Sequence, residues 1–197
     1  MYIEFKVPEN YPGIERHVYD ILARMGWNIL EGAPVRENEP AYRDGKVNVG
    51  NTNGKVLIQT FSREGMKTFL EVFKGKMLCS FLVGAENGLT TEASCDEVIE
   101  FAIASGAQFI GSNLGEGAKD GMSPMFSQRL HAAGLKSNVY SFDTNEQMEK
   151  YFNNGKPLCD GMITNRTDLT LDFYRAKGVR PTGKQGEPED VLRGLGY

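Results

Sequence analysis

Apolar residues recur along this chain with two periods that alternate in a regular order. Runs of period two, or of continuous apolar residues, predict strands, and stretches of period near 3.6 predict amphipathic helices. The predicted strands cover residues 2–7, 56–61, 77–83, 108–112, 137–142 and 160–164. The predicted helices cover residues 14–24, 64–73, 97–104, 125–133, 145–153 and 168–177. One helix follows each strand, so the pattern predicts six βα units.

Residues that favour helix starts stand before several of these helices. Ser62 precedes the second helix, and Thr91 or Ser94 precedes the third. Ser123 followed by Pro124 opens the fourth. A hydroxyl side chain at such a position accepts a hydrogen bond from a free backbone N–H of the first turn, and proline suits the first helical position. These signals support the predicted helix starts.

Strands that alternate with helices favour a parallel sheet. Two architectures fit, a doubly wound open sheet and a (β/α)8 barrel that lacks two units. No Gly-x-Gly-x-x-Gly joins a strand to a helix, and Gly115-Glu116-Gly117 comes too late in its loop. Polar residues gather where the strands end: Lys6, Ser62, Glu86, Asn113, Asp143 and Asn165. Barrel enzymes place their chemistry there, so we predict an α/β, TIM-barrel-like fold with six parallel βα units of an incomplete (β/α)8 barrel.

The chain divides into one predicted domain and a tail. Residues 1–177 hold the partial barrel, and residues 178–197 form a tail with a short helix at 189–195. The polar stretch 31–55 is long for a helix-to-strand connection. We expect it to form an excursion on the barrel face away from the site, with room for a short hairpin near residues 46–54.

Size and composition are those of an ordinary globular protein. The 197 residues are 40% hydrophobic and 24% charged, with a formal net charge of −4. That length suffices for one substantial core. Charges of both signs are spread along the chain, which argues against a nucleic-acid-binding footprint. No stretch is apolar enough for a membrane span, and no signal peptide stands at the start.

The three cysteines lack the spacing of metal ligands. Cys79 and Cys159 lie in apolar runs, where buried free thiols are the simplest reading. Buried thiols favour the cytoplasm as the location of the protein. A secreted or periplasmic location stays open, because a preceding segment could be missing from the chain.

The first predicted strand carries the most distinctive chemistry. Side chains alternate across a strand, so Glu4 and Lys6 point to one face, while Ile3, Phe5 and Val7 point to the other. An acid and a base side by side at a strand end indicate a metal or phosphate site. The alternative is a half-exposed strand whose charged face is simply solvated.

Several segments in order resemble the C-terminal three quarters of the glycerophosphodiester phosphodiesterase family. Residues 3–6 (Ile-Glu-Phe-Lys) are similar to the family's strand with a Glu-x-Lys pair, and 58–61 fit the following strand. Residues 132–144 and the closing segment 160–169 (Asp-Gly-Met-Ile-Thr-Asn-Arg-Thr-Asp-Leu) resemble the last strands and turns of the family. The resemblance extends over residues 2–175.

This resemblance implies a metal-dependent TIM barrel that hydrolyses glycerophosphodiesters to glycerol 3-phosphate and an alcohol. Glu4 would be one carboxylate ligand of a divalent cation, Ca²⁺ or Mg²⁺, both of which prefer oxygen ligands. Lys6 would bind the phosphate and offset its developing charge. Tyr140 would form an aromatic wall for the alcohol. Glu86, placed just past the third strand, would add a carboxylate to the rim.

The family's N-terminal His-Arg-Gly motif, two metal carboxylates and second histidine have no counterpart here. The chain has two histidines, His17 and His131, and both fall within helical patterns, where a surface position is expected. The resemblance therefore implies a truncated or split form. A second copy, or a complementary N-terminal chain, is expected to close the barrel, and the isolated chain is expected to self-associate.

Two other functions fit the same residues. In an aldolase-type barrel, Lys6 would form a Schiff base with a carbonyl substrate, although Glu4 beside it favours the charged amine. Alternatively, the absent histidines fit a non-catalytic, barrel-derived module for binding or assembly.

Overall fold

The computed structural model describes residues 1–25, 27, 42–43, 46–47, 56–73, 77–115, 121–152 and 158–179. Its main sheet contains β1 (Tyr2–Glu4), β4 (Leu57–Thr60), β5 (Leu78–Val83), β6 (Phe109–Asn113), β7 (Lys136–Tyr140) and β8 (Gly161–Met162), in that spatial order. The α-helices are α1 (Ile14–Arg24), α2 (Arg63–Phe73), α3 (Glu92–Ala104), α4 (Pro124–Ala132), α5 (Asn145–Phe152) and α6 (Thr167–Ala176). Two short 3₁₀ helices are η1 (Pro8–Asn10) and η2 (Ala85–Asn87).

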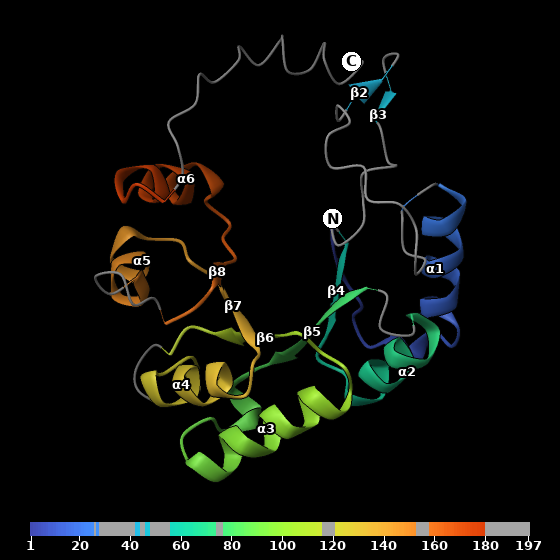
Figure 1. Ribbon diagram of the computed structural model, residues 1–197, viewed down its shortest axis with the longest axis horizontal. Coiled ribbons are helices and arrows are strands. Elements are labelled where there is room, and N and C mark those ends of the chain that lie inside the picture. The colour runs from blue at the N-terminus through green and yellow to red at the C-terminus, as the bar shows by residue number, and fades with distance from the viewer. Residues whose placement is uncertain are drawn as a thin grey trace.

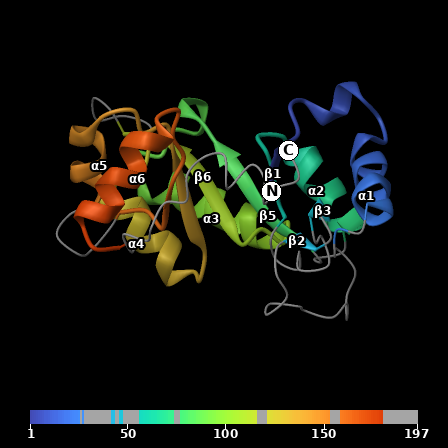
Figure 2. The ribbon, with the colours of Figure 1, turned by 90° about the horizontal axis from the view of Figure 1, so that it is seen from above.

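All neighbouring strands of the main sheet run parallel, and the sheet curls. Figure 1 shows the strands on the inner side of an arc and the helices on its outer side. From above, α1 and α2 lie at one end and α5 and α6 at the other (Figure 2). The Asn138 amide donates to the Tyr2 hydroxyl across the concave side at 3.1 Å, although these residues belong to β7 and β1. The fold is a curled half-barrel of six parallel βα units, as predicted.

The hydrophobic core fills the space between the sheet and its helices. One strand face presents Ile58, Phe81, Ile110 and Val139, all buried, to this layer. The helices contribute the buried side chains Met66, Phe69, Val98, Phe126, Leu130, Met148 and Phe173. Apolar residues on both layers explain why the two periods in the sequence predicted the layers correctly.

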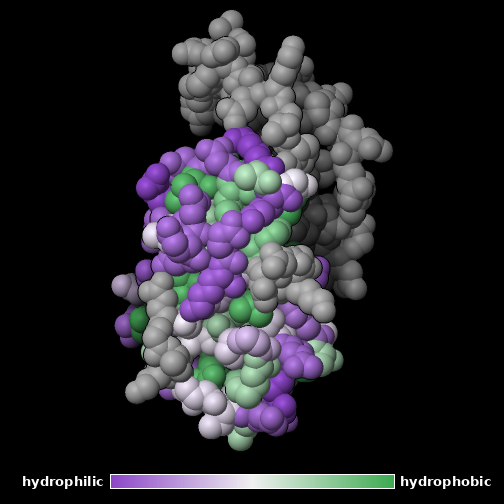
Figure 3. Space-filling model, turned by 90° about the vertical axis from the view of Figure 1, so that its left-hand side faces the viewer, coloured by the Kyte–Doolittle hydropathy of each residue, from purple (hydrophilic) through white to green (hydrophobic). Residues whose placement is uncertain are grey.

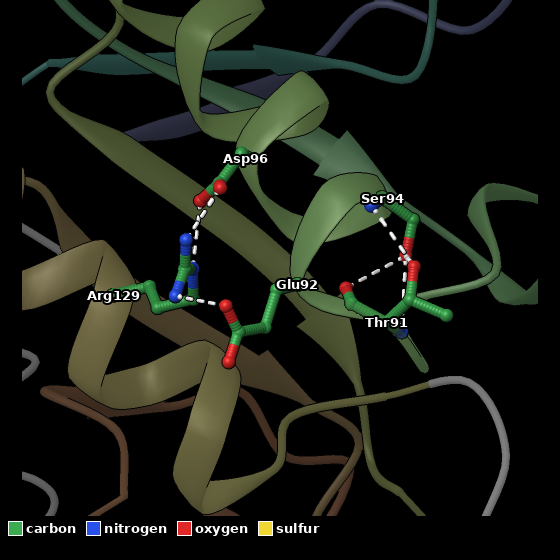
Figure 4. A network of polar contacts seen from close by, with 5 residues as sticks. All are labelled: Thr91, Glu92, Ser94, Asp96 and Arg129. Atoms are coloured by element: carbon green, nitrogen blue, oxygen red, sulfur yellow. Dashed lines mark hydrogen bonds and ion pairs between the residues drawn. The ribbon is translucent and has the colours of Figure 1, made fainter.

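The outer surface of the arc is a solvated one. Figure 3 views it from the side of α4, α5 and α6, where hydrophilic residues dominate and hydrophobic ones are scattered among them. Ionic contacts connect neighbouring helices on this side. The Arg129 guanidinium of α4 contacts Asp96 and Glu92 of α3, beside the Thr91 cap (Figure 4). Among the described residues no helix is long and apolar enough to cross a membrane.

The predicted helix caps are present. The backbone N–H of Gly65 donates to the Ser62 hydroxyl at 2.8 Å. Thr91, and not Ser94, is the N-cap of α3, so that helix starts earlier than predicted. Ser123 accepts from the N–H of Phe126 at the start of α4. These contacts depend on residues close in sequence, which is why they could be predicted.

The first strand is shorter than predicted. Phe5 still donates its N–H to the carbonyl of Gln59, at 2.9 Å, but the chain then turns. Val7 takes the left-handed backbone conformation, with φ 45° and ψ 58°, and starts η1. This conformation is incompatible with a continuing strand, so β1 ends at Glu4 and Lys6 lies in the turn.

Several predicted features lie outside the described residues. They include most of the stretch 31–55, residues 116–120 of the glycine-rich loop, and the predicted tail helix at 189–195. Within the stretch 31–55, β2 (Tyr42–Arg43) and β3 (Lys46–Val47) pair antiparallel, so a short hairpin is present, but it lies earlier in the chain than residues 46–54, where it was expected.

Candidate functional site

Glu4 and Lys6 lie together at the carboxyl end of β1. The Lys6 Nζ is 3.8 Å from the Glu4 Oε1, and the two side chains are 80% and 29% exposed. The other Glu4 oxygen, Oε2, is 3.4 Å from the Gln59 Nε2, which donates a long hydrogen bond to it. Although β1 ends before Lys6, the structure therefore brings the predicted acid and base together.

Gln59 was not predicted as a site residue. It stands opposite Glu4 in the parallel register of β1 and β4, so both side chains extend to the concave face. Gln59 is only 8% exposed, and its Oε1 has no hydrogen-bond partner in the described part of the chain. Buried amide oxygens are normally paired, so this free acceptor marks a polar position in the inner surface.

Tyr140 ends β7 and faces the same concave side. Its hydroxyl donates to the carbonyl of Val83, the last residue of β5, at 2.7 Å. Its ring makes an edge contact with the ring of Phe61, with centroids 6.2 Å apart and planes at 79°. Burial raises the pKa of Tyr140, and the negative charges of Glu86 and Glu4 raise it further. The hydroxyl therefore stays protonated and keeps donating at neutral pH.

Glu86 lies in η2, directly beyond the end of β5. Its carboxylate folds back over Gly84, where a Cβ atom would clash with the Glu86 Oε2. Glycine at position 84 thus leaves the space that this carboxylate occupies. Its negative charge contributes to the raised pKa of Tyr140.

The four predicted residues therefore all lie at the carboxyl edge of the sheet. Glu4, Lys6, Glu86 and Tyr140 come from β1, β5 and β7 or the turns that follow them. Sequence reasoning missed Gln59 and Phe61. The period of two in the sequence places both residues on one face of their strand. Only the strand register and the ring contact show that Gln59 lies opposite Glu4 and that Phe61 contacts Tyr140.

Both histidines are helix residues. His17 is exposed on α1. The His131 Nε2 on α4 is 2.9 Å from the Asp160 Oδ2, and the same oxygen accepts from the backbone N–H of Ser137 near the start of β7. His131 therefore lies at the amino-terminal side of the sheet. The expectation that both histidines are helix surface residues is confirmed.

The site provides few ligands for a divalent cation. Ca²⁺ takes six to eight oxygen ligands and Mg²⁺ six. The described residues contain no group of three or more histidine, cysteine, aspartate or glutamate side chains arranged to hold a metal ion. The Glu4 carboxylate lies beside the side-chain amide of Gln59, whose nitrogen donates to it, and one carboxylate does not make a complete site. The described residues alone do not fit a firmly held metal ion.

Comparisons with known proteins add one finding on the fold. No family model matches the chain, and no curated protein does. A solved structure from Silicibacter pomeroyi DSS-3, named a "putative glycerophosphoryl diester phosphodiesterase", matches with a TM-score of 0.50 and 13% sequence identity. The match covers 68% of this chain and 42% of that one. The chain is therefore similar in fold to less than half of that protein, and the likeness concerns the fold alone.

Proposed function

We propose that this chain forms part of a site that hydrolyses glycerophosphodiesters to glycerol 3-phosphate and an alcohol. The observation that supports this function most directly is the contact between Glu4 and Lys6 on the concave face, 3.8 Å apart, at the carboxyl edge of the sheet. Catalytic groups of barrel enzymes occupy this edge. The fold likeness to a protein named as a phosphodiesterase agrees with the proposal.

Each residue of this edge has a role in the proposal. The exposed ammonium of Lys6 binds a phosphoryl oxygen and offsets charge that develops on it. Glu4 holds that ammonium in place and is one oxygen ligand for Ca²⁺ or Mg²⁺. The ring of Tyr140 forms a wall beside the alcohol part of the substrate.

The remaining parts of the site would come from a partner. The sheet ends at β1 and β8 within the described residues, and further metal ligands and a general acid are needed there. A second copy of the chain, or a complementary chain that supplies the missing βα units, would close the barrel and provide them.

The position of the histidines favours a second candidate function. His131 lies at the amino-terminal side of the sheet and His17 is an exposed residue of α1, whereas diester cleavage needs a proton donor or acceptor within reach of the leaving oxygen. A non-catalytic module for binding or assembly requires no such group. A Schiff-base function of Lys6 is less favoured, because its side chain is 80% exposed beside a carboxylate, whereas a Schiff-base amine is typically activated by burial.

The test is hydrolysis of glycerophosphocholine by the purified chain with Ca²⁺ or Mg²⁺. Glu4→Gln is expected to lower the rate at least about 100-fold, as loss of a charged active-site group does. Glu71→Gln, an exposed change on α2, is the matched control and should leave the rate unchanged. If the chain is inactive alone, a chain that carries the first two βα units of such a barrel is added. Inactivity in every combination would contradict the proposal and favour the binding module.

A Schiff base is tested separately with borohydride and a carbonyl substrate. A stable adduct at Lys6, absent in a Lys6→Arg variant, would support the aldolase-type function and count against the phosphodiesterase.

A further inference from the structure

A small pocket lies between η1 and the first turns of α1 and α2. The two helices pack against each other at one end of the molecule (Figure 2). The pocket has a volume of about 190 Å³, whereas a site for a drug-sized ligand encloses roughly 300–1,000 Å³. Its size therefore suits a single chemical group.

Three glutamates line this pocket, which we call the acidic pocket: Glu9 of η1, Glu15 of α1 and Glu64 of α2. The described residues that line it include no lysine, arginine or histidine. Next to it, Lys67 forms an ion pair with Glu64, with 2.7 Å between Nζ and Oε1. Even with this ammonium counted, two of the three carboxylates lack a positive partner in the described part of the chain.

The walls of the acidic pocket are held in place by contacts within the chain. The Ser62 hydroxyl donates to the Glu9 carboxylate and accepts from the backbone N–H of Gly65. A Cβ atom at Gly65 would clash with the Pro8 ring, so η1 lies directly against the first turn of α2. The pocket is therefore formed before any ligand binds.

Glu15 provides independent evidence for a ligand. It is 5% exposed, and within the described part of the chain it is the one buried residue with a charged side chain. Its carboxylate has no ion-pair or hydrogen-bond partner among the described residues. A buried charge without a partner strongly disfavours the folded state. A positive ligand in the pocket would compensate it.

The helix dipole alone does not explain the burial of Glu15. A glutamate in the first turn of a helix interacts favourably with the positive end of the dipole. An exposed side chain obtains the same interaction, as Glu146 does at the second position of α5. Glu15 also occupies the second position of its helix, but it is buried in the wall of a pocket.

The arrangement favours an organic cation over a metal ion. No three histidine, cysteine, aspartate or glutamate side chains of the described residues are arranged to hold a metal ion, so the three carboxylates do not converge on one point. A guanidinium spreads its charge over a planar group with five N–H donors, which reach acceptors in several directions. An ammonium concentrates its charge at one point.

We propose that the acidic pocket binds a guanidinium group, with Glu15 at its buried base and Glu9 and Glu64 at its exposed rim. Because the pocket holds only one group, it recognises the head group, and the remainder of the ligand projects into solvent. The guanidinium belongs either to an arginine side chain of a partner protein or to a free alkylguanidine. This site is independent of the proposed phosphodiesterase function.

The test is titration of the purified chain with methylguanidinium, followed by NMR or calorimetry. Methylurea is the neutral isostere, and methylammonium carries the same charge without the fork. Methylguanidinium is expected to bind at least about 10-fold more tightly than either, as charge-assisted hydrogen bonds in a fork predict. Equal affinity for methylurea or methylammonium, or no binding of methylguanidinium up to roughly 50 mM, where a millimolar site is saturated, would overturn the inference.

Glu15→Gln locates the binding, and Glu146→Gln is the matched control at the same helix position. Glu15→Gln is expected to weaken methylguanidinium binding at least about 10-fold, through the loss of a charge-assisted contact. Glu146→Gln should leave the binding unchanged. Circular dichroism confirms that each variant is folded. Unchanged binding by a folded Glu15→Gln chain would overturn the inference.

Thermal unfolding without ligand separates a binding residue from a structural one. Removal of an uncompensated buried charge is expected to raise the melting temperature of Glu15→Gln above that of the wild type. Methylguanidinium should raise the melting temperature of the wild type and leave that of Glu15→Gln unchanged. A lower melting temperature of the unliganded variant would mean that Glu15 acts on the helix dipole, and it would overturn the inference as well.

Two further probes distinguish the sources of the guanidinium. N-acetyl-L-argininamide represents an arginine in a protein, and agmatine represents a free alkylguanidine. Tighter binding of the first identifies a partner protein, and tighter binding of the second identifies a small molecule; both support the site. Glu15→Gln is expected to leave any hydrolysis of glycerophosphocholine unchanged, so each of the two proposals stands or fails without the other.

Discussion

Val7 adopts a backbone conformation that a β-branched residue rarely takes. Its φ of 45° lies in the left-handed region, where an L-residue is less stable by about 1–2 kcal/mol. The strand ends here, and Lys6 is set beside Glu4 directly before this residue. Asparagine tolerates the same conformation far better.

We therefore expect Val7→Asn to stabilise the chain by roughly 1 kcal/mol, which for a protein of this size raises the melting temperature by about 2–4 °C. The side chain at position 7 is exposed, so little packing is lost. Thermal unfolding followed by circular dichroism measures the change. Val179→Asn, an equally exposed position without positive φ, is the control, and an equal shift in both variants would refute the explanation by strain.

The Asp160 carboxylate, directly before β8, contacts one group of α4 and two groups of β7. Its Oδ2 contacts the His131 ring and accepts from the backbone N–H and the hydroxyl of Ser137. Partial burial acts to raise the pKa of Asp160, but the hydrogen bonds from His131 and Ser137 outweigh it, so the pKa lies below its ordinary value. A depressed carboxyl pKa contributes stability above the unfolded-state pKa of about 3.9, and this contribution disappears as the pH falls through the folded-state value.

Asp160→Asn is therefore expected to lower the free energy of unfolding by about 1 kcal/mol at pH 7, less than the roughly 1.5–3 kcal/mol of a hydrogen bond to a charged group because the Asp160 side chain is 37% exposed. At pH 3 the difference from the wild type should shrink. Urea unfolding at both pH values measures it. Asp172→Asn, which removes an exposed carboxylate paired within α6, should have a small effect at both. A difference that is independent of pH would contradict the role of the charge.

At the scale of elements, ionic contacts connect neighbouring helices on the outer side of the sheet. The Arg129 Nε donates to Asp96 at 2.7 Å, and its Nη1 donates to Glu92 at 3.1 Å (Figure 4). Arg63 of α2 similarly contacts Glu97 of α3 and stacks on the Phe101 ring, 4.5 Å from its centroid. A planar guanidinium presents a rigid fork of donors that can bind one carboxylate through two N–H groups and still reach a second, and a lysine ammonium lacks this fork.

Arg129→Met is expected to cost about 1 kcal/mol, since the contacts are partly exposed and form a network. Arg129→Lys should recover less than half of this loss, because it keeps the charge and loses the fork. Chemical unfolding at low and high salt measures both changes. Full recovery by lysine would mean that charge alone connects the two helices.

At the scale of the whole molecule, the main feature is a curled sheet that does not close into a barrel within the described residues. Within the described residues, β1 and β8 are edge strands with no further partner strand. Unpaired strand edges promote pairing with other chains. The isolated chain is therefore expected to self-associate, with an average mass by light scattering that rises with concentration. A monomer at all concentrations would contradict this prediction.

The distance in sequence between contacting residues explains which parts of the structure could be predicted. Periods of two and 3.6 and the helix caps depend on neighbours in sequence, so the strands and helices followed from the pattern with small differences in their bounds. The contacts of the site do not depend on such neighbours. Gln59 lies 55 residues from Glu4, and Phe61 meets Tyr140 only because the sheet curls.

The sequence by itself determined the order of the βα units, the parallel sheet and the edge at which the polar side chains collect. Local periodicity and the rule that parallel strands end at one edge are sufficient for these. Only the tertiary structure decided that Val7 takes the left-handed conformation after the first strand, that Gln59 lies beside Glu4 with a free oxygen, and that the Phe61 ring contacts the Tyr140 ring. Register and curvature set these neighbours, and both result from the packing of the whole sheet against its helices.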